Sequence, residues 1–175
     1  MSGRAAAFLD RDGVINADRG YVHDIENFEF LPGVPEALRK LRAAGYLLIV
    51  VTNQSGIGRG LYSEAKMHEL HSYMQTQLAA HGGAFDAIYH CPHDPIQGCE
   101  CRKPLPGLLL QAMNDFDIDR TSSFIVGDRP SDLAAGAAAG LGTGYLIWSD
   151  GKFQSLLDCV DTILATQQAV AARSI

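Results

Sequence analysis

Three aspartates follow apolar segments of the chain at places where acidic side chains could do chemistry. Asp10 and Asp12 come directly after AAAFL (5–9), and Asp128 comes directly after SSFIVG (122–127). Mg²⁺ prefers oxygen ligands, and carboxylates also act as nucleophiles or as acids. This arrangement indicates a magnesium-dependent site, if the two segments are neighbouring strands of one sheet.

Groups that could contact a phosphoryl group follow two other apolar segments. Thr52 follows YLLIVV (46–51), and Lys103 lies beyond FDAIYH (85–90). Taken alone, each has an ordinary interpretation: Thr52 could close a loop with its hydroxyl, and Lys103 could be a surface charge. A hydroxyl and an ammonium beside carboxylates can, however, stabilise a transferring phosphoryl group. The order of these groups along the chain favours phosphoryl-transfer chemistry.

A second cluster of ligating side chains lies within CPHDPIQGCEC (91–101), immediately before Arg102 and Lys103. Its four candidate ligands are Cys91, His93, Cys99 and Cys101. Four ligands predict a closed tetrahedral Zn²⁺ site, whereas a catalytic zinc keeps one position for water. The alternatives are a metal-free loop or a disulfide, which a reducing compartment disfavours. We expect a structural zinc site that holds Arg102 and Lys103 in place.

Apolar strand-like runs alternate with helical patterns along the whole chain. Five runs are continuous rather than alternating, as in strands buried on both faces: 5–9, 46–51, 85–90, 122–127 and 144–148. Helices are expected over 35–45, 63–82, 105–116, 131–140 and 153–172. This alternation predicts a doubly wound, Rossmann-like α/β fold with a parallel sheet, formed by residues 1–175 as a single domain. Such sheets place their chemistry at the carboxyl ends of the strands.

Composition narrows the classes of function. The chain has 175 residues, is 47% hydrophobic and carries a formal net charge of −6, which disfavours nucleic-acid binding. No apolar stretch approaches the ~20 residues that span a bilayer, and the apolar run near the N-terminus is too short for a signal peptide. We expect a cytoplasmic monomer that acts on a small molecule.

Four segments together resemble the ordered motifs of the haloacid dehalogenase superfamily of phosphotransferases. They are FLDRDGVIN (8–16), VVTNQSG (50–56), RKP (102–104) and VGDRPSD (126–132). The resemblance implies that Asp10 is the nucleophile and forms an aspartyl phosphate. It implies that Asp12 protonates the leaving oxygen and then activates water.

The same resemblance implies the metal and phosphoryl ligands. Asp10, the main-chain carbonyl of Asp12, and Asp128 would hold Mg²⁺. Thr52 and Lys103 would bind the phosphoryl oxygens, and Asp132 would support the metal indirectly. An acid two residues after the nucleophile favours a phosphatase over a dehalogenase, because a leaving alkoxide needs a proton. The gaps between the motifs leave no room for a large cap domain.

Two groups of small relatives carry a similar cysteine loop, the heptose bisphosphate phosphatases and the histidinol-phosphate phosphatases. The residues that resemble the sugar-binding positions of the heptose enzymes are Asp18, Arg19, Gly20, Tyr21, Arg102 and Arg129. Two arginines suit a second, non-reacting phosphate, and Asn53 is a further expected substrate contact. The resemblance implies hydrolysis of D-glycero-D-manno-heptose 1,7-bisphosphate at C7, for nucleotide-heptose and lipopolysaccharide biosynthesis.

Some alternatives stay open at this point. Histidinol phosphate would suit Glu26, Glu29 and Tyr21, which lie close together in the sequence. A catalytically inactive binding module on the same scaffold is a further reading, and the sequence does not indicate the anomer at C1. His68 and His71 are expected to be solvated residues of the long helix.

Overall fold

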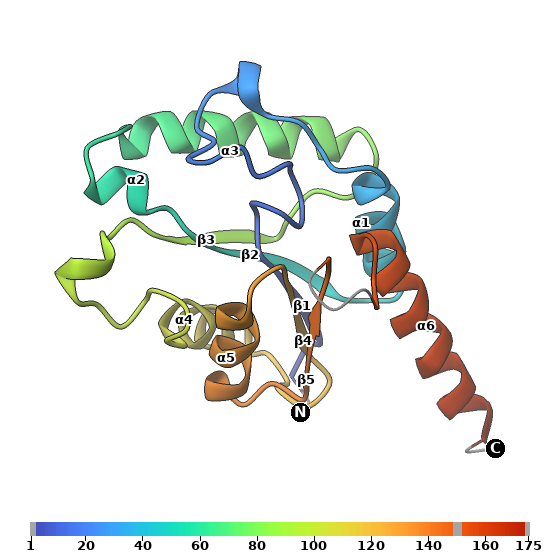
Figure 1. Cartoon of the computed structure of the whole chain (residues 1–175). Coiled ribbons are helices and arrows are strands. Elements are labelled where there is room, and N and C mark those ends of the chain that lie inside the picture. Colours follow the sequence, from blue (N-terminus) through green and yellow to red (C-terminus); the bar gives the residue numbers. More distant parts are fainter. Residues whose placement is uncertain (1–2, 149–151, 174–175) are drawn as a thin grey trace.

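Five parallel strands form one sheet in the order β3-β2-β1-β4-β5 (Figure 1). The computed structural model describes residues 3–148 and 152–173. The strands are β1 (Ala6–Leu9), β2 (Leu47–Asn53), β3 (Ala87–Cys91), β4 (Phe124–Gly127) and β5 (Thr143–Leu146). Each overlaps one predicted run, so the parallel-sheet prediction is confirmed. The strands β1 and β4 are buried throughout, which explains their continuous apolar sequence.

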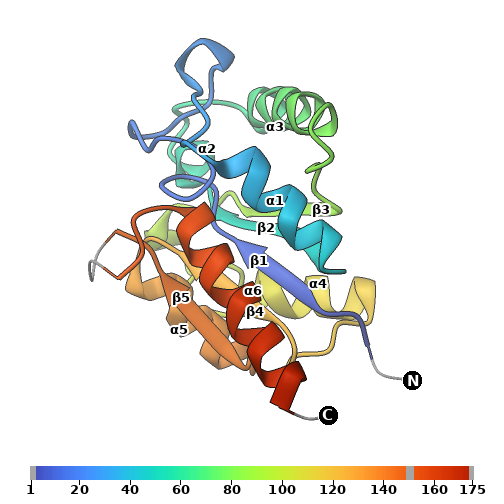
Figure 2. The same ribbon diagram turned by 90° about the vertical axis from the view of Figure 1, so that its right-hand side faces the viewer.

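Helices cover both faces of the sheet (Figure 2). They are α1 (Val34–Ala43), α2 (Ser55–Gly58), α3 (Glu64–Ala79), α4 (Gly107–Phe116), α5 (Pro130–Ala139) and α6 (Leu156–Arg173). One core lies between the sheet and α1, α3 and α6, and the other between the sheet and α4 and α5. Alternate residues of β1 serve the two cores, Ala7 and Leu9 the first, Ala6 and Phe8 the second.

The long predicted helices begin and end close to where their capping signals place them. The Ser63 hydroxyl accepts a hydrogen bond from the backbone amide of Lys66, which caps α3 as its sequence predicts. Gly45 follows the end of α1 with a φ of 90°, a left-handed conformation that glycine adopts without steric cost. The sequence did not reveal α2 or the two 3₁₀ turns, η1 (Ile25–Asn27) and η2 (Pro95–Gln97), because each is too short to show periodicity.

The strand order reverses at β1, which has β2 on one side and β4 on the other. Ligands of such sheets bind outside the carboxyl ends of the strands at this reversal. In the described part of the chain, the connection from β1 to β2 contains η1 and α1, and that from β2 to β3 contains α2 and α3. Neither connection holds a separate cap domain, so loops and the first turns of α2 and α5 surround this edge. None of the described helices has the length and hydropathy needed to cross a membrane.

Candidate active site

A pocket of about 560 Å³ opens at the carboxyl edge of β1 and β2. Its lining combines the predicted catalytic residues Asp10, Asp12, Thr52 and Lys103 with the predicted substrate residues Asp18, Gly20, Tyr21, Asn53, Arg102 and Arg129. Gln54, Ser55, Arg59, Tyr62, Pro104, Ser131 and Asp132 complete it. Residues from four separate motifs of the sequence therefore meet in one cavity, as expected from the sheet topology.

Asp10 and Lys103 form a buried ion pair at the floor of the pocket. The Lys103 Nζ lies 2.9 Å from Asp10 Oδ1 and 2.6 Å from Asp132 Oδ1, and it donates to the Val51 carbonyl at 2.7 Å. Burial raises the pKa of Asp10 to about 7, helped by the charges of Asp132 and Asp12 and opposed by Lys103. Burial works against the charge of Lys103, but the two aspartates outweigh it and raise the pKa of the lysine.

The carboxylates at this floor fit a divalent cation. Asp10, Asp128 and Asp132 offer oxygen atoms within 4.8 Å of one another. Asp128 Oδ1 is buried without a hydrogen-bond partner among the described residues, and a buried unpaired carboxylate oxygen is costly unless a cation accompanies it. The Asp132 carboxylate is already used by Lys103 and by the backbone amide of Arg129. Asp10 and Asp128 are therefore the direct ligands that the arrangement favours, with Asp132 in a supporting position.

The loop after β1 passes very close to Asp128, which fixes the choice of residue at position 13. Gly13 has a φ of 85°, and a Cβ placed there would lie 2.4 Å from Asp128 Oδ2. Any side chain would therefore displace the carboxylate that faces the metal position. Glycine at the end of the Asp-x-Asp-Gly segment keeps the first and fourth strand ends in contact.

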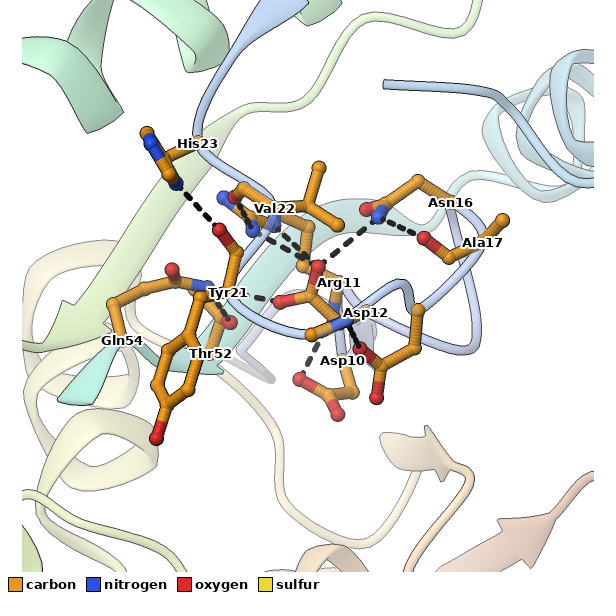
Figure 3. Close-up of polar contacts among 12 residues, drawn as sticks. Asp10, Arg11, Asp12, Asn16, Ala17, Tyr21, Val22, His23, Thr52 and Gln54 are labelled. Atoms are coloured by element: carbon orange, nitrogen blue, oxygen red, sulfur yellow. Dashed lines mark hydrogen bonds and ion pairs between the residues drawn. The ribbon is translucent and has the colours of Figure 1, made fainter. Parts of the chain in front are cut away.

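The Asp12 carboxylate is held by donors from three directions (Figure 3). Its Oδ1 accepts from Arg11 Nη2 at 2.9 Å and from Asn16 Nδ2 at 3.0 Å, and its Oδ2 accepts from Gln54 Nε2 at 3.0 Å. The Gln54 amide also donates to the Thr52 hydroxyl at 2.8 Å. This network fixes the orientation of Asp12 and joins it to the neighbouring strand.

Arg11 is a fully buried arginine whose place in the site the sequence does not reveal. Its Nη2 also donates to the Val22 carbonyl at 2.6 Å, and its Nη1 lies 3.1 Å from His71 Nε2. The prediction that His71 is solvated is wrong, because the side chain packs under the loop with only 5% of its surface exposed. Burial, together with the charge of Arg11, lowers the pKa of His71 to about 3, so the imidazole is neutral and accepts from the guanidinium.

Tyr62 supports the glutamine that contacts Asp12. The Tyr62 hydroxyl donates to Gln54 Oε1 at 2.6 Å, which orients the amide nitrogen toward Asp12 and Thr52. His23 stacks on the Tyr62 ring, with the ring centroids 4.6 Å apart. Neither aromatic residue stood out in the sequence, because the Tyr62 contact depends on the path of the loop after α2 and the His23 contact joins distant segments.

The cations of the pocket rim differ in how far protein groups neutralise them. Arg102 Nη1 is buried without a hydrogen-bond partner among the described atoms. Arg129 pairs with Asp18 at 2.9 Å, which joins two of the predicted substrate segments. Arg59 pairs with Asp94 at 3.0 Å and lies over the ring of Tyr21.

Two predicted substrate residues have other partners. Arg19 is not among the pocket residues, and its guanidinium is paired with Glu29 at the exposed surface. Asn53 lines the pocket, but its amide donates to the Lys103 carbonyl and accepts from the Lys103 amide, both at 3.1 Å. The clearest role of Asn53 is thus to hold the lysine backbone.

The cysteine segment forms a compact set of four ligand atoms. Cys91 Sγ lies 3.6 Å from Cys99 Sγ and 3.5 Å from His93 Nδ1, while Cys101 Sγ lies 3.5 Å from Cys99 Sγ and 3.3 Å from His93 Nδ1. Zn–S bonds near 2.3 Å in a tetrahedron put ligand atoms roughly 3.5–3.8 Å apart, which these separations approach. The four residues therefore fit one Zn²⁺, with His93 bound through Nδ1.

Comparison with known proteins agrees with this fold and site. The haloacid dehalogenase-like hydrolase family matches residues 4–140, and the chain belongs to that family. The predicted family and fold class are thereby confirmed.

Individual relatives are more specific. The chain is 49% identical over 149 residues to D-glycero-beta-D-manno-heptose-1,7-bisphosphate 7-phosphatase of Yersinia pestis, covering 81% of this chain and 79% of that protein. It is 48% identical over 164 residues to the protein of the same name from Pasteurella multocida, covering 87% and 89%. The crystal structure of D,D-heptose 1,7-bisphosphate phosphatase from B. bronchiseptica, complexed with magnesium and phosphate, is similar with a TM-score of 0.85 and 34% identity, covering 93% of this chain and 99% of that one.

Proposed function

We propose that this chain is a magnesium-dependent phosphatase that hydrolyses the C7 phosphate of D-glycero-β-D-manno-heptose 1,7-bisphosphate. Its similarity to relatives of that name supports the substrate and the β anomer. The solved relative with magnesium and phosphate supports the metal. The heptose 1-phosphate product would keep its anomeric phosphate.

The first half of the proposed reaction transfers the phosphoryl group to the protein. An Asp10 oxygen attacks phosphorus, the bond from phosphorus to the C7 oxygen breaks, and the Asp12 carboxyl gives its proton to that oxygen. Lys103 and the Thr52 hydroxyl contact the phosphoryl oxygens. Asp10, Asp128 and the Asp12 carbonyl would hold a Mg²⁺ ion, which would supply positive charge to offset that of the phosphoryl group.

The second half releases phosphate. Asp12, now a carboxylate, takes a proton from water, and the water oxygen attacks phosphorus and breaks its bond to Asp10. Arg11, Asn16 and Gln54 keep Asp12 in one orientation through both halves. The acid and base roles therefore rest on a side chain whose position the surrounding network fixes.

The observation that carries the bisphosphate assignment is the unpaired guanidinium nitrogen of Arg102. A buried guanidinium nitrogen without a hydrogen-bond partner is costly, and the phosphate of a ligand would satisfy it with a charge-assisted hydrogen bond. Arg102 adjoins Lys103 in the sequence and lines the same pocket, so a ligand with two phosphates can contact both residues. Arg129 and Arg59 also line the pocket, each paired with an aspartate.

Histidinol phosphate is less well matched by this pocket. Glu26 and Glu29, the acidic residues that could receive its amine, are not among the residues that line the cavity. Glu29 is instead paired with Arg19. The unpaired guanidinium nitrogen of Arg102 favours an anionic second group over a cationic one.

The remaining parts of the proposal concern the setting of the enzyme. Residues 1–175 act as one domain and as a monomer in the cytoplasm, where cysteine thiols stay reduced and available to zinc. The Cys91, His93, Cys99 and Cys101 site takes a structural Zn²⁺ that fixes the loop leading into Arg102. The product would enter nucleotide-heptose synthesis, with lipopolysaccharide as the end use.

The test is a comparison of kcat/KM for the β and α anomers of the heptose bisphosphate and for histidinol phosphate, with Mg²⁺ constant. We expect the β bisphosphate to be the best substrate and histidinol phosphate to be hydrolysed poorly. Preference for histidinol phosphate would refute the substrate assignment. Absence of turnover of all three, by protein that binds them, would support the inactive binding module instead.

A further inference from the structure

A third group of ligating side chains lies outside the pocket, between the first turns of α3 and the carboxyl end of β3. It consists of Glu64, His68 and His90, whose candidate ligand atoms all lie within 4.8 Å of one another. Glu64 and His68 are four residues apart on α3 and therefore share one face of the helix. Figure 1 shows the start of α3 above the end of β3, and a contact between Glu64 and His90 joins the two elements.

Two of the three ligands are already in contact, and the third is free to join them. His90 Nε2 lies 2.6 Å from Glu64 Oε1. The His68 ring packs edge-to-face on His90, with centroids 5.4 Å apart. In the described part of the chain, the His68 imidazole has ring contacts but no hydrogen-bond partner. A hydrogen bond between Glu64 and His90 thus explains only part of this cluster.

The set is chemically suited to a borderline transition metal. Two imidazoles and a carboxylate, with water in the remaining positions, bind ions such as Zn²⁺. Tetrahedral bonds of about 2.0–2.2 Å would separate the ligand atoms by roughly 3.3 Å. The side chains of Glu64 and His68 are exposed and can move until their ligand atoms reach this separation, while the β3 backbone holds His90 in place.

Lys66 belongs to the same turn of α3 as Glu64 and His68, and it is paired with Asp24 and Glu69. These pairs occupy the one lysine of this turn, so it does not compete for Glu64. A metal ion would replace the proton shared by Glu64 and His90 and add a third ligand.

This cluster is separate from the cysteine site, although His90 and Cys91 are adjacent in the sequence. Successive side chains of a strand point to opposite faces of the sheet. Cys91 packs with the core under α4, whereas His90 is directed toward α3. The two sets share no ligand, so both can be occupied together.

We infer that Glu64, His68 and His90 form a second transition-metal site, which binds Zn²⁺ at the surface and joins α3 to β3. It is weaker than the cysteine site, because it has three ligands, two of them exposed, instead of four that include thiolates. It is open to solvent, so the ion exchanges with the medium. An ion bound there ties the helix that carries His71 to the sheet.

The test is a calorimetric titration of Zn²⁺ into protein whose cysteine site already holds one zinc per chain, in excess Mg²⁺. We expect a further binding event that His68→Ala or Glu64→Gln weakens by at least roughly tenfold, since even outer-shell changes at metal sites cost that much. His81→Ala is the matched control, because His81 is exposed and lies beyond the end of α3. It should bind Zn²⁺ as the parent does.

A second measurement identifies the ligands directly. In ¹H–¹⁵N spectra of the imidazoles, Zn²⁺ should shift the ring nitrogens of His68 and His90 in the parent and leave those of His81 in place. An event of unchanged affinity in His68→Ala and Glu64→Gln would assign the extra zinc to the catalytic carboxylates and overturn the inference. So would the lack of any event beyond the first zinc.

Discussion

The buried His71 predicts a specific loss of stability in mild acid. In the folded chain its pKa is about 3, lowered by burial and by the charge of Arg11, against 6.5 for an ordinary histidine. The other titratable groups facing it are His68 and His90. Because the folded state binds the proton less tightly, the unfolded state gains stability as pH falls below the unfolded pKa. The free energy of unfolding keeps falling until the pH reaches the pKa of His71 in the folded state.

The magnitude follows from linkage. At about pH 5.5 the unfolded imidazole is mostly protonated while the folded one is not, which costs about 1.4 kcal/mol of unfolding free energy. At about pH 7.5 the same term is only about 0.1 kcal/mol. The difference depends little on the exact folded value, since both pH values lie well above it.

The assay is urea unfolding of the parent and of His71→Gln at these two pH values. Glutamine offers Arg11 a neutral acceptor and does not titrate. Between the two pH values, the variant should therefore lose about 1.3 kcal/mol less unfolding free energy than the parent. His81→Gln, which changes an exposed histidine, should lose as much as the parent. Effects of acid on the zinc ligands are common to all three proteins and cancel in the comparison. Equal losses in the parent and His71→Gln would refute the assignment of a buried neutral histidine.

Three further predictions concern the pocket and its loop. Arg102→Ala should lower kcat/KM for the bisphosphate about 10–100-fold, because charge-assisted hydrogen bonds are lost, while hydrolysis of a small aryl phosphate changes little. Equal losses on both substrates would count against second-phosphate binding. Asn53→Ala should lower kcat about tenfold with zinc content unchanged, because the Lys103 backbone loses two hydrogen bonds. Unchanged kinetics would show that Asn53 is not needed to hold Lys103. Chelation of zinc, or Cys99→Ser, should lower both the melting temperature and the rate at constant Mg²⁺. A metal-free chain with parental stability and rate would contradict a structural zinc.

The sequence predicted those features that repeat locally or depend on residue chemistry. Buried parallel strands have continuous apolar sequences, so β1 and β4 could be recognised from their residues alone. The cluster of Cys91, His93, Cys99 and Cys101 could be recognised because its ligands lie within eleven residues. Sheet topology then placed the aspartates of the first and fourth strands together.

The features that the sequence did not predict depend on contacts between distant segments. His71 lies sixty residues from Arg11 along the chain, and nothing in the sequence around His71 indicates burial beneath that guanidinium. Gln54, just before the short helix α2, contacts Asp12 from forty-two residues away, and Tyr62 in the loop after α2 orients it. The two hydrogen bonds of Asn53 with the backbone of Lys103 likewise join residues fifty positions apart.

The most direct test of the central claim is to trap and locate the phosphoryl group. In Asp12→Asn, the bisphosphate should leave a phosphoryl group on Asp10 that is hydrolysed slowly, and mass spectrometry of rapidly quenched protein should find it on that residue. Asp10→Asn should form no phosphoenzyme and turn over no substrate. Normal turnover by Asp10→Asn, or a phosphoryl group found on another residue, would contradict the account.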